Sequence, residues 1–286
     1  MNSLLEKTLT LLPDRAYISL KYWYHFKKWP DLKNPKTFNE KIQWLKLYDR
    51  KPIYTTMVDK YEAKEYIRSK IGDEYIIPSY GVWESFDDIP FDNLPNQFVL
   101  KTTHDCGGVV IVRDKSSFEK EKAKAFLNNH LKRNYFYEGR EWPYKNVKPR
   151  ILAEAYMENK ASGDLKDYKF FCFDGDVKAL FIAADRQSKE EETKFDFYDE
   201  NFIHLDIRNG HPNSNLKIDK PINFDLMKKL SSELSKGFPH LRVDFYEVNG
   251  KVYIGELTFS HYSGMIPFEP DKWDKIFGDW IQLPVR

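Results

Sequence analysis

Two acidic side chains on neighbouring predicted strands are the first candidates for chemistry in this 286-residue chain. Asp244 lies in Arg-Val-Asp-Phe and Glu256 in Gly-Glu-Leu-Thr, and Asn249-Gly250 between them is typical of a two-residue hairpin turn. An ideal register places Asp244 opposite Gly255, so the two carboxylates face opposite sides unless a bulge at Gly255 brings them together. Two carboxylates one strand apart suit Mg²⁺, whose other positions go to phosphates and water. Solvent-facing acids on a half-buried hairpin are the alternative interpretation.

A lysine followed by a glycine-containing loop is the second candidate. Lys101 comes late in the apolar stretch 97–103, and His-Asp-Cys-Gly-Gly follows at 104–108. A buried lysine is costly unless an anion neutralises it, and the backbone N–H groups of Gly107 and Gly108 suit an approach to phosphate oxygens. An edge-strand lysine beside a hairpin turn has the same signature, because glycine is common in turns.

Two further segments carry charged and aromatic side chains. Asp167-Tyr168-Lys169 precedes the turn Asp174-Gly175, and Arg186 follows the next strand. Pairing across that turn places Lys169 near residues 178–180, so Lys169 and Arg186 line one cleft only if their side chains share a face. Arg-Glu-Trp-Pro-Tyr at 140–144 is either an acceptor-binding segment or an aromatic loop packed on the core. Surface charge is the alternative for Lys169 and Arg186.

Composition and missing motifs exclude several classes of function. The 45 Lys and Arg residues nearly balance the 44 Asp and Glu residues, so no overall field favours nucleic acid. The chain has no P-loop, no Gly-x-Gly-x-x-Gly after a strand and no Gly-x-Ser-x-Gly. Asp174-Gly175-Asp176 has the form of a glycosyltransferase Asp-x-Asp, but turn geometry also explains it. Cys106 and Cys172 match no metal-ligand spacing.

Local signals predict the elements that position these residues. Capping boxes and apolar spacing predict helices that begin at Thr37, Asp59 and Ser116, and a fourth helix over about 224–236. Alternating or continuous apolar runs predict strands at 97–103, 108–112, 151–156, 168–173, 177–182, 241–248 and 251–259. Helices come first and hairpins follow, which favours an α+β fold over a doubly wound parallel sheet.

The order of these features, from about residue 55 to 266, resembles that of an ATP-grasp enzyme. Residues 34–41 (Asn-Pro-Lys-Thr-Phe-Asn-Glu-Lys) and 140–144 are similar to strings of the branch named for a teichuronopeptide biosynthesis protein, the TupA-like branch. The resemblance implies an ATP-grasp fold, in which two α+β subdomains sandwich ATP. It also implies a helical N-terminal region at 1–55 and an ATP-grasp domain at 56–286, with a mobile lid at about 97–157.

The resemblance also implies a role for each candidate residue. The residues implied to bind ATP are Lys60, Lys101, Gly107, Gly108, Glu154, Ala155, Tyr156, Met157 and Asp167. The residues implied to act on the transferring phosphoryl group are Lys169, Arg186 and Arg242. The implied Mg²⁺ ligands are Asp244, Glu256 and Thr258, and the implied substrate-binding residues are Arg140, Glu141, Trp142, Tyr144 and Ser263.

Two positions depart from the family pattern. Thr258 stands where the usual Glu-x-Asn motif has asparagine, and Lys169 stands where Asp-x-Arg has arginine, which keeps the charge and loses the bidentate fork. The function implied is an ATP- and Mg²⁺-dependent ligase that activates a carboxylate and joins it to an amine, with a surface polysaccharide precursor as the expected acceptor. A kinase of the same fold, a glycosyltransferase and a nucleotide-binding module without chemistry are the alternatives.

We expect a cytoplasmic protein with a small-molecule or glycan substrate and no nucleic-acid partner. Residues 1–12 lack the apolar core of a signal peptide, and no apolar run is long enough to span a bilayer. A peripheral membrane contact stays open, and the sequence does not address the oligomeric state.

Overall fold

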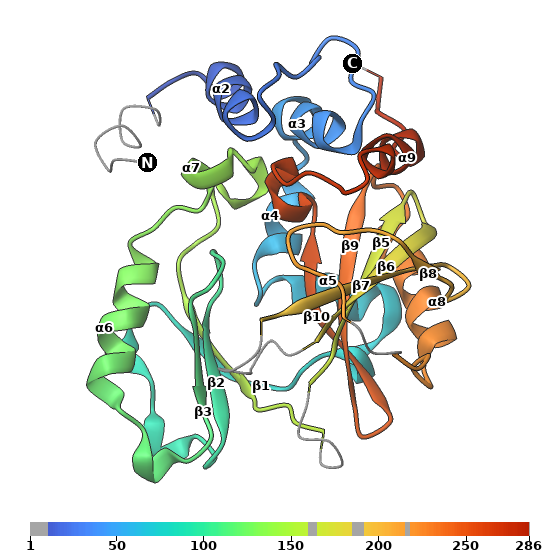
Figure 1. The fold of residues 1–286 in the computed structure, drawn as a ribbon. Coiled ribbons are helices and arrows are strands. Elements are labelled where there is room, and N and C mark those ends of the chain that lie inside the picture. Colours follow the sequence, from blue (N-terminus) through green and yellow to red (C-terminus); the bar gives the residue numbers. More distant parts are fainter. Residues whose placement is uncertain (1–10, 160–164, 185–191, 215–217, 286) are drawn as a thin grey trace.

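The computed structural model describes residues 11–159, 165–184, 192–214 and 218–285 (Figure 1). Two antiparallel sheets lie side by side in it, the smaller one on the left of Figure 1 and the larger one on the right. The smaller sheet has, in spatial order, β1 (Ser79–Trp83), β4 (Ile151–Ala155), β2 (Phe98–Thr102) and β3 (Val109–Val112). The larger has β10 (Lys251–Thr258), β9 (Leu241–Val248), β5 (Asp167–Phe173), β6 (Asp176–Ala184), β7 (Lys194–Asp199) and β8 (His204–Leu205).

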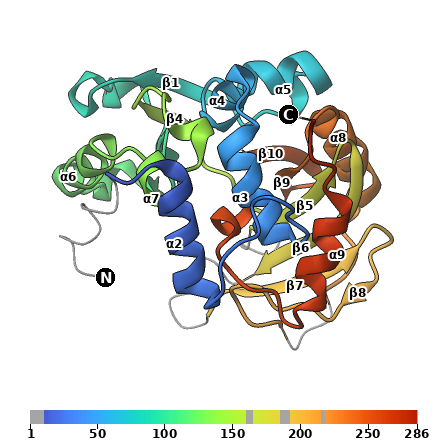
Figure 2. The same ribbon diagram turned by 90° about the horizontal axis from the view of Figure 1, so that it is seen from above.

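Helices cover both faces of the larger sheet. On one face pack α4 (Pro52–Val58), α5 (Ala63–Ile71) and α8 (Phe224–Ser235). On the other pack α3 (Phe38–Tyr48) and α9 (Lys272–Trp280), which lie next to each other in Figure 2. Strand β5 serves both cores because its side chains alternate: Phe170 belongs to the first cluster and Phe171 to the second.

The smaller sheet has its own core under α6 (Lys120–Leu131). Leu127 of α6 and Leu100 of β2 are both fully buried in it. Helices α2 (Asp14–Phe26) and α7 (Phe136–Gly139) lie at the end of the molecule that is uppermost in Figure 1. Short 3₁₀ helices connect the elements at Asp73–Tyr75, Phe86–Asp88, Phe91–Asn93, Lys115–Ser117, Trp142–Tyr144 and His261–Gly264.

The α+β class and the seven predicted strands are confirmed, with ends that shift by one or two residues. The capping box at Thr37 is present, since its hydroxyl accepts from the N–H of Glu40. Two predicted helix starts were wrong. Helix α6 begins at Lys120, after a 3₁₀ turn. Helix α5 begins at Ala63, and the carboxylate of Asp59 caps the turn before it by accepting from the N–H groups of Tyr61 and Glu62.

Lys101 lies on β2, an inner strand between β4 and β3, so the edge-strand alternative was wrong for it. Local signals did not predict α2, α4, α7, α9, β1, β7 or β8, although α2 falls in the N-terminal region that the resemblance implied to be helical. No helix in the described part of the chain has the length and apolar character needed to cross a bilayer.

Candidate active site

The two acidic residues of the last hairpin come together through a bulge. Strands β9 and β10 start in the expected register, with Val248 opposite Lys251, and the register shifts between Ile254 and Glu256. The extra residue is Gly255, so Glu256 lies opposite Asp244. The bulge that the sequence analysis required for the two carboxylates to share one face is therefore present.

Both carboxylate oxygens of Asp244 accept charge-assisted hydrogen bonds. Arg242 donates from Nε to Oδ1 and from Nη2 to Oδ2, each at 2.7 Å. Lys169 lies directly opposite on β5 and donates to Oδ2 of Asp244. Lys169 also pairs with Oδ2 of Asp167 at 2.7 Å, so four of the predicted site residues form one buried cluster.

The charges in this cluster stabilise one another. Burial by itself raises the pKa of Asp244 and lowers that of Arg242, because it penalises either charge. The positive charges of Arg242 and Lys169 outweigh burial and hold the pKa of Asp244 below its usual value. Asp244 in turn raises the pKa of Arg242, so both side chains are ionised at neutral pH.

The guanidinium group of Arg242 also bonds to a neutral histidine, His261. Nη1 of Arg242 donates to Nδ1 of His261 at 2.7 Å, and Nε2 of His261 donates to Oδ1 of Asn209 at 2.8 Å. Burial and the charge of Arg242 lower the pKa of His261 well below its usual range, which favours the neutral ring that these two bonds require. Thr258 also contacts Arg242, accepting from Nη2 at 3.1 Å.

The glycine loop and Lys60 face Glu256 from the side of the smaller sheet. Nζ of Lys60 donates to the carbonyl of Asp105 at 2.5 Å and lies 3.9 Å from Oε1 of Glu256. Two hydrogen bonds hold the glycine loop in place, because the carboxylate of Asp105 is bonded to the Thr102 hydroxyl and to the His130 ring. These contacts place the loop next to the paired acids.

A third group of charges centres on Glu154. Its two carboxylate oxygens pair with Lys64 at 2.6 Å and Lys101 at 2.7 Å. Burial raises the pKa of Glu154, but the two lysines outweigh burial and leave that pKa below its usual value. A narrow cavity of about 30 Å³ lies among these side chains and is bordered by Lys60 and Glu256. Lys60, the Glu154 group and Glu256 therefore border one space.

The predicted substrate residues do not form one cluster in the structure. Arg140 is buried under α2, where it stacks 4.5 Å over the Tyr17 ring and donates to the carbonyl of Leu12, so it does not point to the site. Glu141 is bonded to Ser263 and lies beside the buried Lys46, which donates to the Ser263 carbonyl at 2.9 Å. Burial raises the pKa of Glu141 and lowers that of Lys46.

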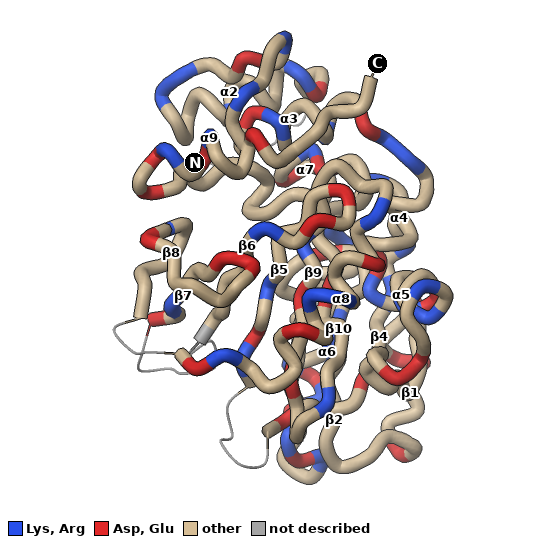
Figure 3. Tube along the Cα trace, turned by 90° about the vertical axis from the view of Figure 1, so that its right-hand side faces the viewer, with Lys and Arg blue, Asp and Glu red and all other residues tan. Residues whose placement is uncertain are grey.

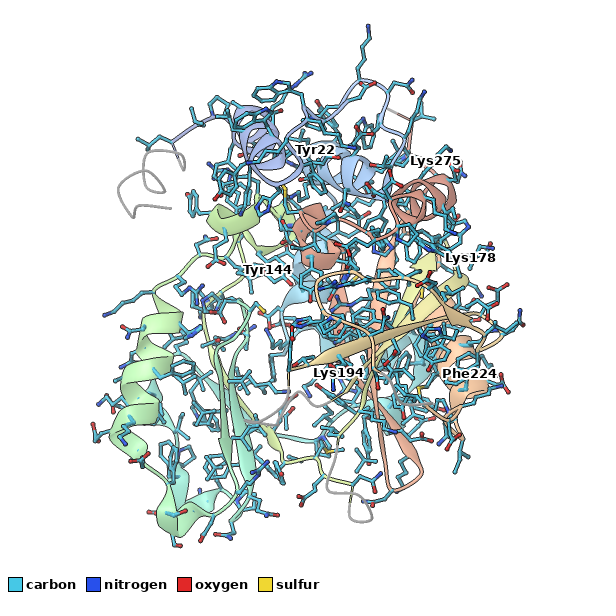
Figure 4. The ribbon with its side chains drawn as sticks, in the orientation of Figure 1. Tyr22, Tyr144, Lys178, Lys194, Phe224 and Lys275 are labelled. Atoms are coloured by element: carbon cyan, nitrogen blue, oxygen red, sulfur yellow. The ribbon has the colours of Figure 1, made fainter. Side chains whose placement is uncertain are left out.

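Tyr144 packs in a small core with Val58 and Val147. Burial raises its pKa, and the negative charges of Glu256 and Glu141 add to that effect. Figure 4 labels it beneath α7, between the smaller and the larger sheet. Trp142 packs on the core of the larger sheet. Ala155 ends β4, Tyr156 and Met157 follow it, and Arg186 lies outside the described residues.

Sequence reasoning missed Lys64, His261 and Asn209. Lys64 follows Lys60 by four residues and could have been found by that spacing. No local signal pointed to the other two, since 52 residues separate His261 from Asn209. The Asp-x-Asp segment is not near the site described here: Asp174 starts the turn and accepts from the N–H of Gly237 at 2.7 Å, and Asp176 is exposed.

With this geometry in place, comparison with known proteins identifies the family. The family described as TupA-like ATP-grasp matches residues 40–282, which is most of the chain. The chain therefore belongs to the TupA-like ATP-grasp family and has the ATP-grasp fold, as the sequence predicted. No curated protein matches it significantly.

Several solved structures are similar to the chain. One is the D-alanine–D-alanine ligase of Bacillus anthracis complexed with ATP (17% identity, 71% of this chain and 54% of that chain, TM-score 0.40). A second is the N5-carboxyaminoimidazole synthetase of Staphylococcus aureus (14% identity, 80% and 53%, TM-score 0.41). A third is the ATP-grasp ligase PsnB complexed with a phosphomimetic precursor variant, Mg and ADP (10% identity, 77% and 57%, TM-score 0.42). The chain spans just over half the length of each.

Proposed function

We propose that the chain is an ATP- and magnesium-dependent ligase that activates a carboxylate as an acyl phosphate and joins it to an amine. One observation carries this proposal. The Gly255 bulge aligns Asp244 with Glu256, and Lys60, bonded to the glycine loop, lies 3.9 Å from Glu256. Family membership supplies the nucleotide as the ligand that this arrangement fits.

The donor set fits magnesium that arrives with a nucleotide. The described residues contain no group of three or more His, Cys, Asp or Glu side chains that could hold a metal ion alone. Asp244, Glu256 and Thr258 offer two carboxylates and a hydroxyl, and Mg²⁺ commonly takes one or two carboxylates and completes its shell with phosphate and water. Magnesium would supply charge neutralisation for the phosphates. We therefore expect tight Mg²⁺ binding only in the presence of ADP or ATP.

The positive side chains act by position and charge. In the first step a carboxylate oxygen attacks the γ-phosphorus of ATP, and the bond to ADP breaks. In the second step the amine attacks the acyl carbon, and inorganic phosphate leaves. Lys169 and Arg242 lie beside Asp244, where they would neutralise charge that develops on the phosphoryl group. Lys101 and Lys64 are held by Glu154, and from there they can reach an entering phosphate or base.

The smaller sheet is suited to act as a lid. It has its own core under α6, so it can move as a unit against the larger sheet. Closure over the nucleotide would exclude water from the acyl phosphate. Residues 97–157 remain our proposal for this mobile part.

The acceptor side is proposed to bind a surface-polysaccharide precursor, following the resemblance of residues 34–41 and 140–144 to the TupA-like branch. The negative charge of Glu256 contributes to raising the pKa of both Tyr144 and Glu141, which supports a place for these two side chains near the acidic pair. The glycosyltransferase alternative has less support, because Asp174 is engaged in its turn. A kinase of the same fold would use the same nucleotide site, transfer the phosphoryl group to an acceptor such as a sugar hydroxyl, and stop at the phosphorylated product.

The decisive experiment is an ATP-consumption screen of uronic-acid glycans against amino acids, with the product amide detected by mass spectrometry. A ligase releases ADP only when a carboxylate is present and forms the amide only when an amine is added. We expect Glu256→Ala to reduce turnover by at least 100-fold and the matched Asp176→Asn variant to keep it. ADP release together with a stable phosphorylated glycan would identify a kinase, and UDP-sugar turnover lost in Asp176→Asn would identify a glycosyltransferase. The cytoplasmic location stays a prediction.

A further inference from the structure

Helix α2 presents an aromatic face that is exposed among the residues the structure describes. Tyr17, Ile18 and Tyr22 are buried against the protein, and Figure 4 labels Tyr22 on this helix. The other side of the helix and the turn after it carry large apolar side chains with exposures of 40 to 60%. These form the aromatic face: Leu20, Trp23, Tyr24 and Trp29.

The aromatic face is a continuous patch. Leu20, Trp23 and Tyr24 follow the i, i+3, i+4 spacing of one helix stripe. Trp29 folds back so that its ring stacks on Trp23, with the ring centres 6.0 Å apart. The ammonium group of Lys27 lies over both Tyr24 and Trp23, at 4.8 and 5.5 Å from the ring centres.

Positive charge surrounds this patch. Residues 14–36 contain six Lys and Arg residues against two Asp, whereas the whole chain carries a net charge of +1. Both acids are already engaged: Asp14 pairs with Arg50 at 2.7 Å, and Asp31 accepts from the N–H groups that follow it. Figure 3 shows Lys and Arg positions on and around α2 at this end of the molecule. The exposed cations form the basic rim: Arg15, Lys27, Lys28, Lys33 and Lys36.

We infer that this face binds the surface of a membrane that contains anionic phospholipids. Trp and Tyr favour the boundary between headgroups and acyl chains, because each ring has an apolar body and a polar edge. Lysines beside them gain from the negative surface potential. Helix α2 has 13 residues, too few to cross a bilayer, so it would lie in the plane of the surface.

The inference does not depend on the proposed reaction, since none of these residues is part of the candidate active site. Its chemistry favours lipid over a free glycan. An aromatic platform for sugars does not need a cationic rim, whereas an anionic bilayer uses both features.

The test is sedimentation of the full chain with vesicles of phosphatidylcholine alone or with 30% phosphatidylglycerol. We expect binding that requires the anionic lipid and falls as salt is raised. Each lysine near such a surface contributes about a fivefold change in affinity, so Lys27→Ala with Lys28→Ala should weaken binding about 25-fold. Trp23→Ala with Trp29→Ala should weaken binding and remove the quenching of tryptophan fluorescence by brominated lipid.

Matched controls are Lys132→Ala with Lys251→Ala for the charge and Tyr80→Ala for an exposed ring, all distant in sequence from α2. These should bind vesicles as the wild type does. All the substituted side chains are exposed, so the variants should keep the wild-type circular dichroism and ADP affinity. Absent or equal binding to both vesicle types would overturn the inference. So would equal losses in the controls, or binding of a soluble glycan to the aromatic face without vesicle binding.

Discussion

Replacing Lys169 with methionine removes the central positive charge of the Asp167–Lys169–Asp244 cluster while keeping a side chain of similar length. The side chain of Lys169 is 11% exposed, and those of Asp167 and Asp244 are 1% and 2% exposed. Removing one partner of a buried ion pair costs about 3–5 kcal/mol, because the remaining charge stays out of water without compensation. Asp244 keeps two bonds to Arg242, so we expect the lower end of this range, about 3 kcal/mol.

Equilibrium urea unfolding at pH 7 measures this loss. The matched control is Lys178→Met, on the next strand and labelled in Figure 4, whose pair with Asp176 is exposed and should be worth less than about 0.5 kcal/mol. Lys169→Arg keeps the charge and should recover most of the stability. The deficit should also shrink on acidification, because protonation neutralises the uncompensated carboxylate.

The same variants separate the structural role of Lys169 from its proposed role in phosphoryl transfer. We expect ATP turnover in Lys169→Met to fall by at least 100-fold, with ADP affinity within about threefold of wild type, since a charge on the transferring phosphoryl group is absent from ADP. A stability within 0.5 kcal/mol of wild type would refute the buried-pair reasoning. Full turnover in the methionine variant would refute the catalytic assignment.

Three further predictions concern single side chains. Burial lowers the pKa of His240 to about 3, so the unfolded chain binds a proton there below about pH 6.5 and the folded protein does not. His240 alone should therefore lower the stability by about 1.4 kcal/mol per pH unit from pH 6 to 4, and His240→Asn should reduce the slope of the urea-unfolding free energy against pH by that amount. In His261→Asn the amide oxygen can take the place of Nδ1 and accept from Arg242, whereas the longer side chain in His261→Gln extends past that position. The asparagine variant should therefore keep more turnover than the glutamine variant, and equal losses would contradict a role for His261 in positioning Arg242. A Cβ on Gly108 would lie 1.8 Å from Oγ1 of Thr102, so Gly108→Ala should displace the glycine loop and weaken ADP binding at least tenfold. Adding Thr102→Ala to the same chain should restore part of the lost ADP affinity, and calorimetry measures both effects.

Much of the local structure was readable from the sequence because its causes are local. Asn249-Gly250 and Asp174-Gly175 fix tight turns, since both residues of each pair adopt positive φ, and the runs beside them pair as hairpins. The capping box at Thr37 fixed the start of α3. Lys169 was expected near residues 178–180 and pairs with Phe181, because a second irregularity shifts the register between Phe171 and Cys172.

The sequence by itself determined which acids share a hairpin, which lysine precedes the glycine loop and, through family resemblance, which fold joins them. Only the tertiary structure decided which basic side chain pairs with which buried carboxylate. Asp244 meets Lys169 from a strand 75 residues away, and Glu154 meets Lys64 across 90 residues. Such pairs depend on strand order and on which face each strand buries, and neither leaves a signal in local spacing. The same holds for Arg140, whose side chain the packing of α2 turns away from the site.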